Sequence, residues 1–272
     1  MTKKRREFSV VNKTRNIASQ NRRRGVFLLP NAITTGAMFS GFFAIVAATE
    51  GKFLFAGIAL LAAMILDALD GRVARAMKAE SDFGKQFDSL SDMVAFGVAP
   101  GVLAFEWGLN TLSQIGWAIT FLYMACAALR LARFNIAGDS SSFTGLPSPM
   151  ACGVVASAAW LWGDMFQTSP HISVVIVMAA LVVGIALLMV SNIRYYSPKL
   201  FRIRGRIPYV SFVVLVLVLA VIFVNPPLVF FICTMAYALS GPGEYVWRRF
   251  KKPASVDEVA DDVEVDEQQK AD

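Results

Sequence analysis

Four aspartates between positions 67 and 92 have the residue type and the spacing of a metal-binding site. Asp67 and Asp70 are three residues apart, and Asp88 and Asp92 are four apart, so each pair lies on one face of a helix. A turn at 80–83 would fold the two helices antiparallel and bring these faces together. Carboxylate oxygens are the ligands that Mg²⁺ and Mn²⁺ prefer, and four of them suit two ions better than one.

The residues around these aspartates leave space for an anionic ligand. Gly71, Ala74 and Gly84 have small or absent side chains, so a ligand can approach the backbone there. Arg75 follows Gly71 by four residues and can reach a phosphate bound beside it. A solvated loop with ordinary surface charges is the alternative, but the regular spacing and the apolar neighbours speak against it.

These residues occur in a chain whose composition is that of a membrane protein. It has 272 residues, of which 56% are hydrophobic and 17% charged, and its mean hydropathy is +0.54. Because soluble domains average about 25% charged residues, this composition argues against a soluble globular enzyme. The three cysteines stand singly in apolar runs, which gives neither a disulfide framework nor a thiolate metal site. The single histidine, His171, is expected in a loop.

The uncharged stretches predict an all-α fold, a polytopic membrane helix bundle with about eight transmembrane helices. The expected helices cover about 28–49, 53–79, 84–107, 113–135, 147–163, 171–191, 208–224 and 227–247. Pro100, inside the third of them, predicts a kink. The four aspartates would lie at the ends of the second and third helices, where a charge is costly unless it lines a wet cavity or binds an ion.

The distribution of basic residues predicts the orientation of the bundle. Alternate loops and tails hold 25 of the 26 Lys and Arg residues, and the opposite loops hold only Lys52. The positive-inside rule then places both termini and the aspartates on the cytoplasmic side, and a six-span alternative would keep this orientation. The transmembrane domain, 27–250, is flanked by a basic cytoplasmic arm, 1–26, and a disordered acidic tail, 251–272. The arm either binds anionic head groups or serves only as a topology signal.

The aspartates also belong to a longer pattern that resembles a known family. Eight residues match its signature, spacing included: Asp67, Asp70, Gly71, Ala74, Arg75, Gly84, Asp88 and Asp92. This pattern is similar to that of the CDP-alcohol phosphatidyltransferases, and Pro30-Asn31 opens the first helix as in that family. At the level of motif and helix order, the resemblance covers about residues 27–135.

The resemblance implies a role for each of these positions. Asp67 and Asp88 would bridge two divalent ions, Mg²⁺ or Mn²⁺, while Asp70 would ligate the first ion and Asp92 the second. Asp92 would also be the general base that takes the proton of the acceptor hydroxyl. The residues implied in binding the CDP part of the donor are Pro30, Asn31, Ala32, Ile33, Gly71, Arg75 and Ser81.

The resemblance further implies a phosphotransferase that works on a lipid. Its donor would be CDP-diacylglycerol, whose acyl chains stay in the bilayer, and an alcohol would attack the lipid-linked phosphorus as CMP leaves. The protein would be a multi-pass protein of the bacterial cytoplasmic membrane, with its active site on the cytoplasmic side and no nucleic-acid partner. Homodimers are usual in the family, and Gly, Ala and Ser on the third and fourth helices fit such a contact.

Two further segments, 130–135 and 143–149, resemble the phosphatidylserine synthase branch of the family, whose acceptor is L-serine and whose product is phosphatidylserine. This likeness extends to about residue 200. Arg130 or Arg133 could hold the carboxylate of serine through paired donors. The other residues that could bound the acceptor pocket are Asn135, Gly145, Pro147 and Ser148. Membrane anchoring by one of the arginines, and a plain helix start at Pro147, are the alternatives.

Two other functions stay open. Within the same family, phosphatidylglycerophosphate synthase uses a phosphorylated acceptor, which would need a denser basic pocket. Such a pocket could come from Arg194, Arg202, Arg204 and Arg206. A cation transporter would need acids near the midplane of several spans, whereas the acids here lie at the ends of two.

Overall fold

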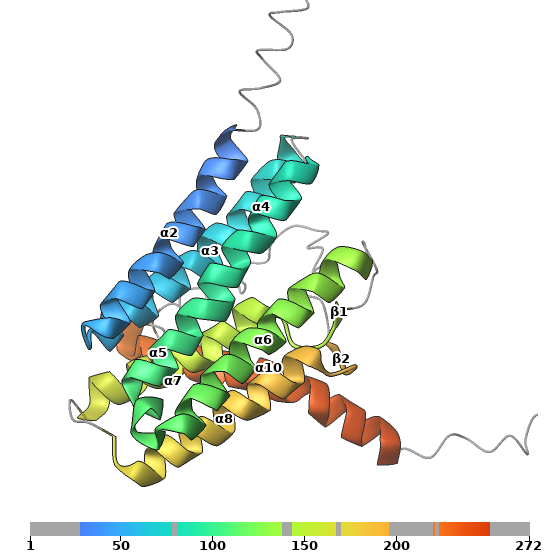
Figure 1. Cartoon of the computed structure of the whole chain (residues 1–272). Helices are drawn as coiled ribbons and strands as arrows, with labels where there is room; N and C mark the ends of the chain where they lie inside the picture. The colour runs from blue at the N-terminus through green and yellow to red at the C-terminus, as the bar shows by residue number, and fades with distance from the viewer. Residues whose placement is uncertain are drawn as a thin grey trace, which may run out of the picture.

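The computed structural model describes residues 28–77, 81–137, 143–166, 170–195, 220 and 223–250. Within them the chain is a helical bundle with one short ladder of two strands (Figure 1). The elements are α2 (Leu28–Thr49), α3 (Phe53–Ala76), α4 (Asp82–Asp92), η1 (Met93–Val98), α5 (Ala99–Trp107), η2 (Leu109–Leu112), α6 (Gln114–Ala137), β1 (Phe143–Thr144), α7 (Ser148–Phe166), α8 (Ile172–Val190), β2 (Arg194–Tyr195) and α10 (Pro226–Phe250).

Five segments of this bundle are long and apolar enough to cross a membrane. They are α2, α3, the continuous run Asp82–Trp107, residues Gln114–Ile136 of α6, and α8. The expected all-α, multi-pass fold is therefore confirmed. Helices α7 and α10 match the fifth and eighth expected helices in position, but they are not among these five.

The number of eight spans stays a prediction, because most of the expected helix 208–224 lies outside the described residues. The basic arm 1–26 and the acidic tail 251–272 also lie outside them. The cytoplasmic location of both termini likewise stays a prediction.

Small residues set how closely the first three segments pack. Helices α2 and α3 form a hairpin whose connection contains Gly51 at φ +72°, a backbone conformation that glycine adopts without strain. Gly41 of α2 lies directly against Ala95, where a Cβ would come within 2.6 Å of the Ala95 Cα. Since small residues let membrane helices approach each other closely, the start of α2 is held beside the end of α3 and the start of α4 (Figure 1).

The kink expected at Pro100 stays a prediction, but a π-helical turn, η1, ends two residues before this proline. Proline has no N–H, so it leaves the carbonyl four residues earlier without its helical donor. That carbonyl, Phe96 O, accepts a hydrogen bond from the fully buried Tyr123 hydroxyl at 3.2 Å. The neighbouring helix α6 therefore satisfies the group that proline frees, as buried polar groups require.

A small ladder connects the start of α7 to the end of α8 and the middle of α10. Strands β1 and β2 are antiparallel, and Thr144 is paired with Arg194. Gly145, at φ +83°, follows β1 and donates its N–H to Ile193 O at 2.8 Å. Burial, with Tyr237 beside it, raises the pKa of Tyr195 to about 12. Its hydroxyl therefore stays protonated and donates to Ala238 O of α10 at 3.0 Å.

Candidate active site

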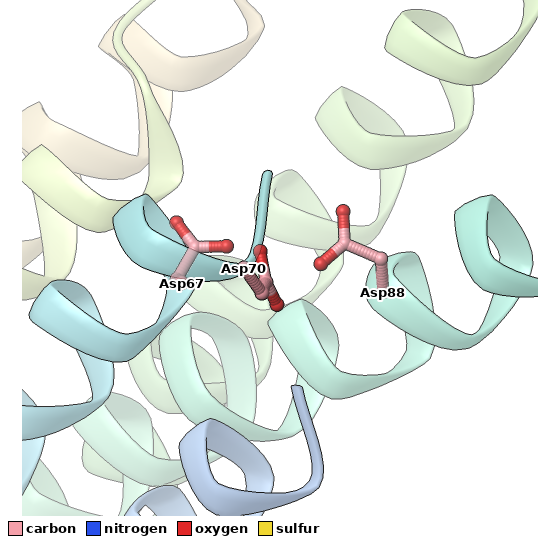
Figure 2. Close-up of side chains that lie close together, drawn as sticks. All are labelled: Asp67, Asp70 and Asp88. Atoms are coloured by element: carbon pink, nitrogen blue, oxygen red, sulfur yellow. The ribbon is translucent and has the colours of Figure 1, made fainter. Parts of the chain in front are cut away.

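Three of the four predicted aspartates form one compact group of carboxylates. One oxygen from each of Asp67, Asp70 and Asp88 lies within 4.8 Å of the others. Asp67 and Asp70 come from the last turns of α3, and Asp88 reaches them from α4 (Figure 2). The helix hairpin expected from the spacing thus brings the two faces together.

Neutral donors, not basic side chains, hold Asp70 in place. Its Oδ2 accepts a hydrogen bond from Thr34 Oγ1 at 2.7 Å, and only 5% of the residue is exposed. Thr34 is itself fixed because its backbone oxygen accepts from the buried Ser91 hydroxyl at 3.1 Å. Helices α2, α3 and α4 therefore meet around one carboxylate, and no ion pair to it is found among the described residues.

The chemistry of this group fits a divalent cation. Asp88 Oδ1 is buried and has no hydrogen-bond partner among the described residues. A buried carboxylate oxygen without a donor is costly, and an ion bound between Asp67, Asp70 and Asp88 would satisfy it. Three carboxylates at this separation are the hard oxygen ligands that Mg²⁺ and Mn²⁺ prefer.

Asp92 is not part of this compact group of three carboxylates, and its neighbours differ from theirs. Its carboxyl group is within hydrogen-bonding reach of Asp67 and close enough to Arg130 to interact electrostatically with it. Asp92 therefore adjoins both the carboxylate group, through Asp67, and the guanidinium of Arg130.

Asp70 and Asp88 line a cavity of about 140 Å³, which Asp67 and Asp92 do not line. Its lining includes most of the residues expected to bind the CDP group: Pro30, Asn31, Gly71, Arg75 and Ser81. Ser81 also caps α4, because its hydroxyl accepts from Gly84 N at 3.0 Å. A Cβ on Gly84 would lie 3.1 Å from that hydroxyl, so glycine lets the cap and the first turn of α2 approach each other.

Two of the residues expected on the nucleotide side do not line this cavity. Ala32 is exposed and Ile33 half-buried, and both point away from the face that Pro30 and Asn31 share with Thr34. The helical period of 3.6 residues explains this difference. The sequence did not single out two residues that line the cavity. Thr34 follows Pro30 by four residues on the same face of α2, and Lys85 lies on α4.

The two arginines of the expected acceptor pocket have different surroundings. Arg130 is 9% exposed, and its Nη1 donates to the Ser148 hydroxyl at 2.6 Å. Its Nε is buried without a partner in the described part of the chain. Arg130 and Ser148 thus present unused donor capacity close to Asp92.

Arg133 instead holds two loops together. Its guanidinium donates to Thr144 O, to Val190 O at 3.3 Å and to Asn192 Oδ1 at 3.4 Å. Gly145 packs beneath this guanidinium, so a side chain there would meet both Arg133 and Met189 O. Arg133 and Gly145 therefore fix the segment that leads to Ser148.

The remaining residues of the expected acceptor pocket have structural partners. Asn135 Nδ2 donates to Ser89 Oγ of α4 at 3.0 Å and does not contact the Arg130–Ser148 pair. Pro147 is half-buried and directly precedes α7, where its carbonyl accepts from Ala151 N at 3.0 Å. Tyr237 of α10, which the sequence reasoning did not single out, lies close enough to Arg130 to interact electrostatically and stacks on Tyr195.

Comparison with known proteins places these features in a family. The family model for CDP-alcohol phosphatidyltransferase matches residues 27–240. A CDP-diacylglycerol–serine O-phosphatidyltransferase of Helicobacter pylori is 35% identical over 204 residues, which is 74% of this chain and 84% of the relative. The Bacillus subtilis protein of that name is 36% identical over 170 residues, or 61% of this chain and 89% of the relative. An archaetidylserine synthase of Methanothermobacter thermautotrophicus is 35% identical over 61% of this chain and 69% of its own length. The chain belongs to the CDP-alcohol phosphatidyltransferase family.

Proposed function

We propose that this protein transfers the phosphatidyl group of CDP-diacylglycerol to L-serine and produces phosphatidylserine and CMP. The observation that carries the proposal is that the carboxylates border two different environments. Asp70 and Asp88 line the cavity, whereas Asp67 and Asp92 interact with Arg130. The donor would bind in the cavity, the acceptor would bind near Arg130, and the two would meet at the carboxylates. The relatives that are named CDP-diacylglycerol–serine O-phosphatidyltransferases support serine as the acceptor.

The cavity side suits the nucleotide diphosphate of the donor. Arg75 and Lys85 provide cationic groups, and Gly71 and Gly84 remove side chains where phosphate oxygens would approach the backbone. Guanidinium groups bind phosphate through paired, charge-assisted hydrogen bonds. We assign the residues Pro30, Asn31, Gly71, Arg75 and Ser81 to the CDP moiety.

The carboxylates would hold two divalent ions, Mg²⁺ or Mn²⁺. Asp67, Asp70 and Asp88 would hold one, and Asp67, Asp88 and Asp92 would share the second. When bound, such ions neutralise the diphosphate and stabilise the departing CMP. Thr34 and Ser91 keep the carboxylate of Asp70 oriented without cancelling its charge.

The acceptor side would carry the proton transfer. Asp92 takes the proton of the serine hydroxyl as that oxygen attacks the lipid-linked phosphorus, which makes it the general base. Arg130, with a buried and unpaired Nε, binds the serine carboxylate, and Ser148 orients its guanidinium. Because Arg133 is bound to loop carbonyls, we assign it the role of holding the acceptor segment, not of binding serine.

The bilayer would keep the donor at the site. Large apolar side chains such as Phe39, Phe42 and Ile65 are exposed on α2 and α3, as lipid-facing surfaces require. We place the active site on the cytoplasmic side of a bacterial inner membrane, because basic residues gather at the same end of the bundle. A homodimer through small residues of the third and fourth expected helices is part of this proposal.

The test follows CMP release from CDP-diacylglycerol by the purified protein in detergent with Mg²⁺ or Mn²⁺. Serine, glycerol 3-phosphate and inositol 1-phosphate serve as alternative acceptors, beside Asp92→Asn and a chelator control. Release with serine alone, lost in the variant and with the chelator, supports the proposal. Release with another acceptor would keep the donor and metal assignments but refute serine. No release by folded protein that binds metal would refute the enzyme and favour cation transport.

A further inference from the structure

A second cavity of the described bundle lies at the end away from the aspartates. It has a volume of about 640 Å³ and is formed by the start of α3, the end of α5, η2 and the end of α7. Phe53 lines it, and Asp70 follows 17 residues later on the same helix. At a rise of 1.5 Å per residue, the two sites are about 26 Å apart along α3. This cavity is therefore separate from the candidate active site.

Its lining carries more acidic than basic charge. Glu106 and Asp164 contribute carboxylates, and Lys52 contributes the cation. Lys52 is already paired with Glu50 at 2.7 Å, outside the lining. Glu106 is half-buried and forms no ion pair with any residue that the structure describes. A carboxylate at the edge of a membrane span is costly without a cation, so Glu106 has capacity for one.

Two indole rings add a second feature that selects cations. Trp107 is 4% exposed, and its Nε1–H has no hydrogen-bond partner within the described ranges. Trp162 lies edge-on to it, with ring centroids 6.0 Å apart and an interplanar angle of 87°. Both rings line the cavity. Tryptophan faces attract ammonium groups, and an unpaired indole N–H suits an anionic oxygen such as that of a phosphodiester.

This combination distinguishes the type of cation. A metal ion requires several oxygen ligands at short range, and only two carboxylates line this cavity among aromatic rings. An organic ammonium ion interacts with carboxylates and with aromatic rings, because carboxylates neutralise its charge and indole rings pack against its carbon atoms. We propose that this cavity binds an ammonium group and that the carboxylates of Glu106 and Asp164 and the rings of Trp107 and Trp162 recognise it.

Two sources can supply such a group: the head group of an aminophospholipid in the bilayer, and a soluble amine. In a phospholipid the phosphodiester next to the ammonium would lie near Lys52 and the Trp107 N–H. The experiment therefore includes both sources. The protein is reconstituted into nanodiscs of phosphatidylglycerol, which contains no ammonium group. Dihexanoyl phosphatidylethanolamine and tetramethylammonium chloride are titrated separately, with sodium chloride as reference, and intrinsic tryptophan fluorescence is recorded.

The expected result is a saturable fluorescence change that is lost in Trp107→Phe. Glu106→Gln and Asp164→Asn should each weaken binding about tenfold, the loss of one charged contact. Asp82→Asn is the matched control, because it removes one exposed carboxylate at the other end of the bundle and should leave binding unchanged. Since Asp164 is exposed, its variant tests the proposal even if Glu106→Gln fails to fold.

The two titrations separate the sources. A response to the lipid alone supports a head-group site, and a response to both probes supports recognition of the ammonium group itself. No saturable response to either probe, or unchanged affinity in the Glu106 and Asp164 variants, would overturn the proposal.

Discussion

Removing one carboxylate from the aspartate group should stabilise the metal-free protein and abolish its response to metal. The oxygens of Asp67, Asp70 and Asp88 lie within 4.8 Å of one another. At that distance two unit charges repel by about 1 kcal/mol in water and about 3 kcal/mol at an effective dielectric constant near 20. Asp88→Asn removes two such pairs and keeps the shape of the side chain. The metal-free variant should therefore gain about 2 kcal/mol or more in free energy of unfolding.

Thermal unfolding in detergent, followed with and without Mg²⁺, measures both effects. A gain of that size raises the melting temperature of a domain this large by about 4–8 °C. An ion present at 100 times its dissociation constant stabilises the native state by about 2.7 kcal/mol. Wild type should therefore gain stability as Mg²⁺ is added, whereas Asp88→Asn should start higher and hardly change.

Asp82→Asn is the control for this prediction. It removes an exposed carboxylate from the first turn of the same helix, outside the group of three. Its melting temperature should rise with Mg²⁺ as in wild type, from a starting value slightly below it because the helix N-terminus loses a favourable charge. If metal-free Asp88→Asn were less stable than wild type, or if Mg²⁺ stabilised it equally, the carboxylates would not form a repelling, metal-binding group.

Three further substitutions test the surroundings of the group. Arg130→Lys should lower kcat/KM for serine about 10- to 100-fold, because a point charge cannot replace the forked N–H donors of arginine. The half-saturating concentration of CDP-diacylglycerol should stay constant, and an effect confined to CDP-diacylglycerol would refute this role. Thr34→Val should weaken the Mg²⁺-dependent rise in melting temperature by removing the 2.7 Å donor to Asp70, and a full rise would contradict it. Gly145→Ala should lower the free energy of unfolding by at least about 2 kcal/mol, since the φ of +83° and the nearby Met189 O leave no space for a Cβ. Chemical denaturation measures this loss, and an unchanged stability would contradict the prediction.

The spacing of the aspartates was sufficient to predict how they meet. Intervals of three and four residues repeat the helical period, so each pair shares a face whatever the rest of the chain does. The turn between the helices then sets the two faces against each other. The partner of Asp70 could not be found in this way, because Thr34 lies 36 residues away on α2 and reaches Asp70 only through the packing of α2 against α3.

Arg130 and Arg133 show a different limit of sequence reasoning. They are three residues apart on the same helix and have the same chemical type, so the sequence left open which of them would hold serine. Their roles separate because Ser148 lies beside one, while the ends of β1 and α8 lie beside the other. These contacts depend on the β1–β2 ladder, whose two strands of two residues carry no periodic signal.

The surroundings of Pro100 could be predicted from the sequence in part. The missing N–H of proline predicts a carbonyl without its helical donor, four residues earlier. It does not predict which group replaces the donor, and the structure supplies Tyr123 from a neighbouring helix. The covalent structure of proline thus identifies the carbonyl that lacks a donor, and the tertiary packing determines which side chain supplies the donor.

The distribution of counter-charges within the site follows a consistent physical requirement. A basic side chain paired with Asp70 or Asp88 would stabilise the metal-free carboxylates, and it would compete with a cation for the same oxygens. Arg75 and Lys85 line the same cavity as these two carboxylates, but no ion pair joins them within the described residues. The Thr34 hydroxyl orients Asp70 without that competition. The buried guanidinium of Arg130 instead lies near Asp92, and neither of these two residues lines the cavity. Under the proposed function, Arg130 attracts an anionic acceptor to Asp92 while Asp70 and Asp88 bind metal. Exchanging these neighbours would weaken both functions, since the metal would meet a cation and the acceptor an uncompensated negative charge.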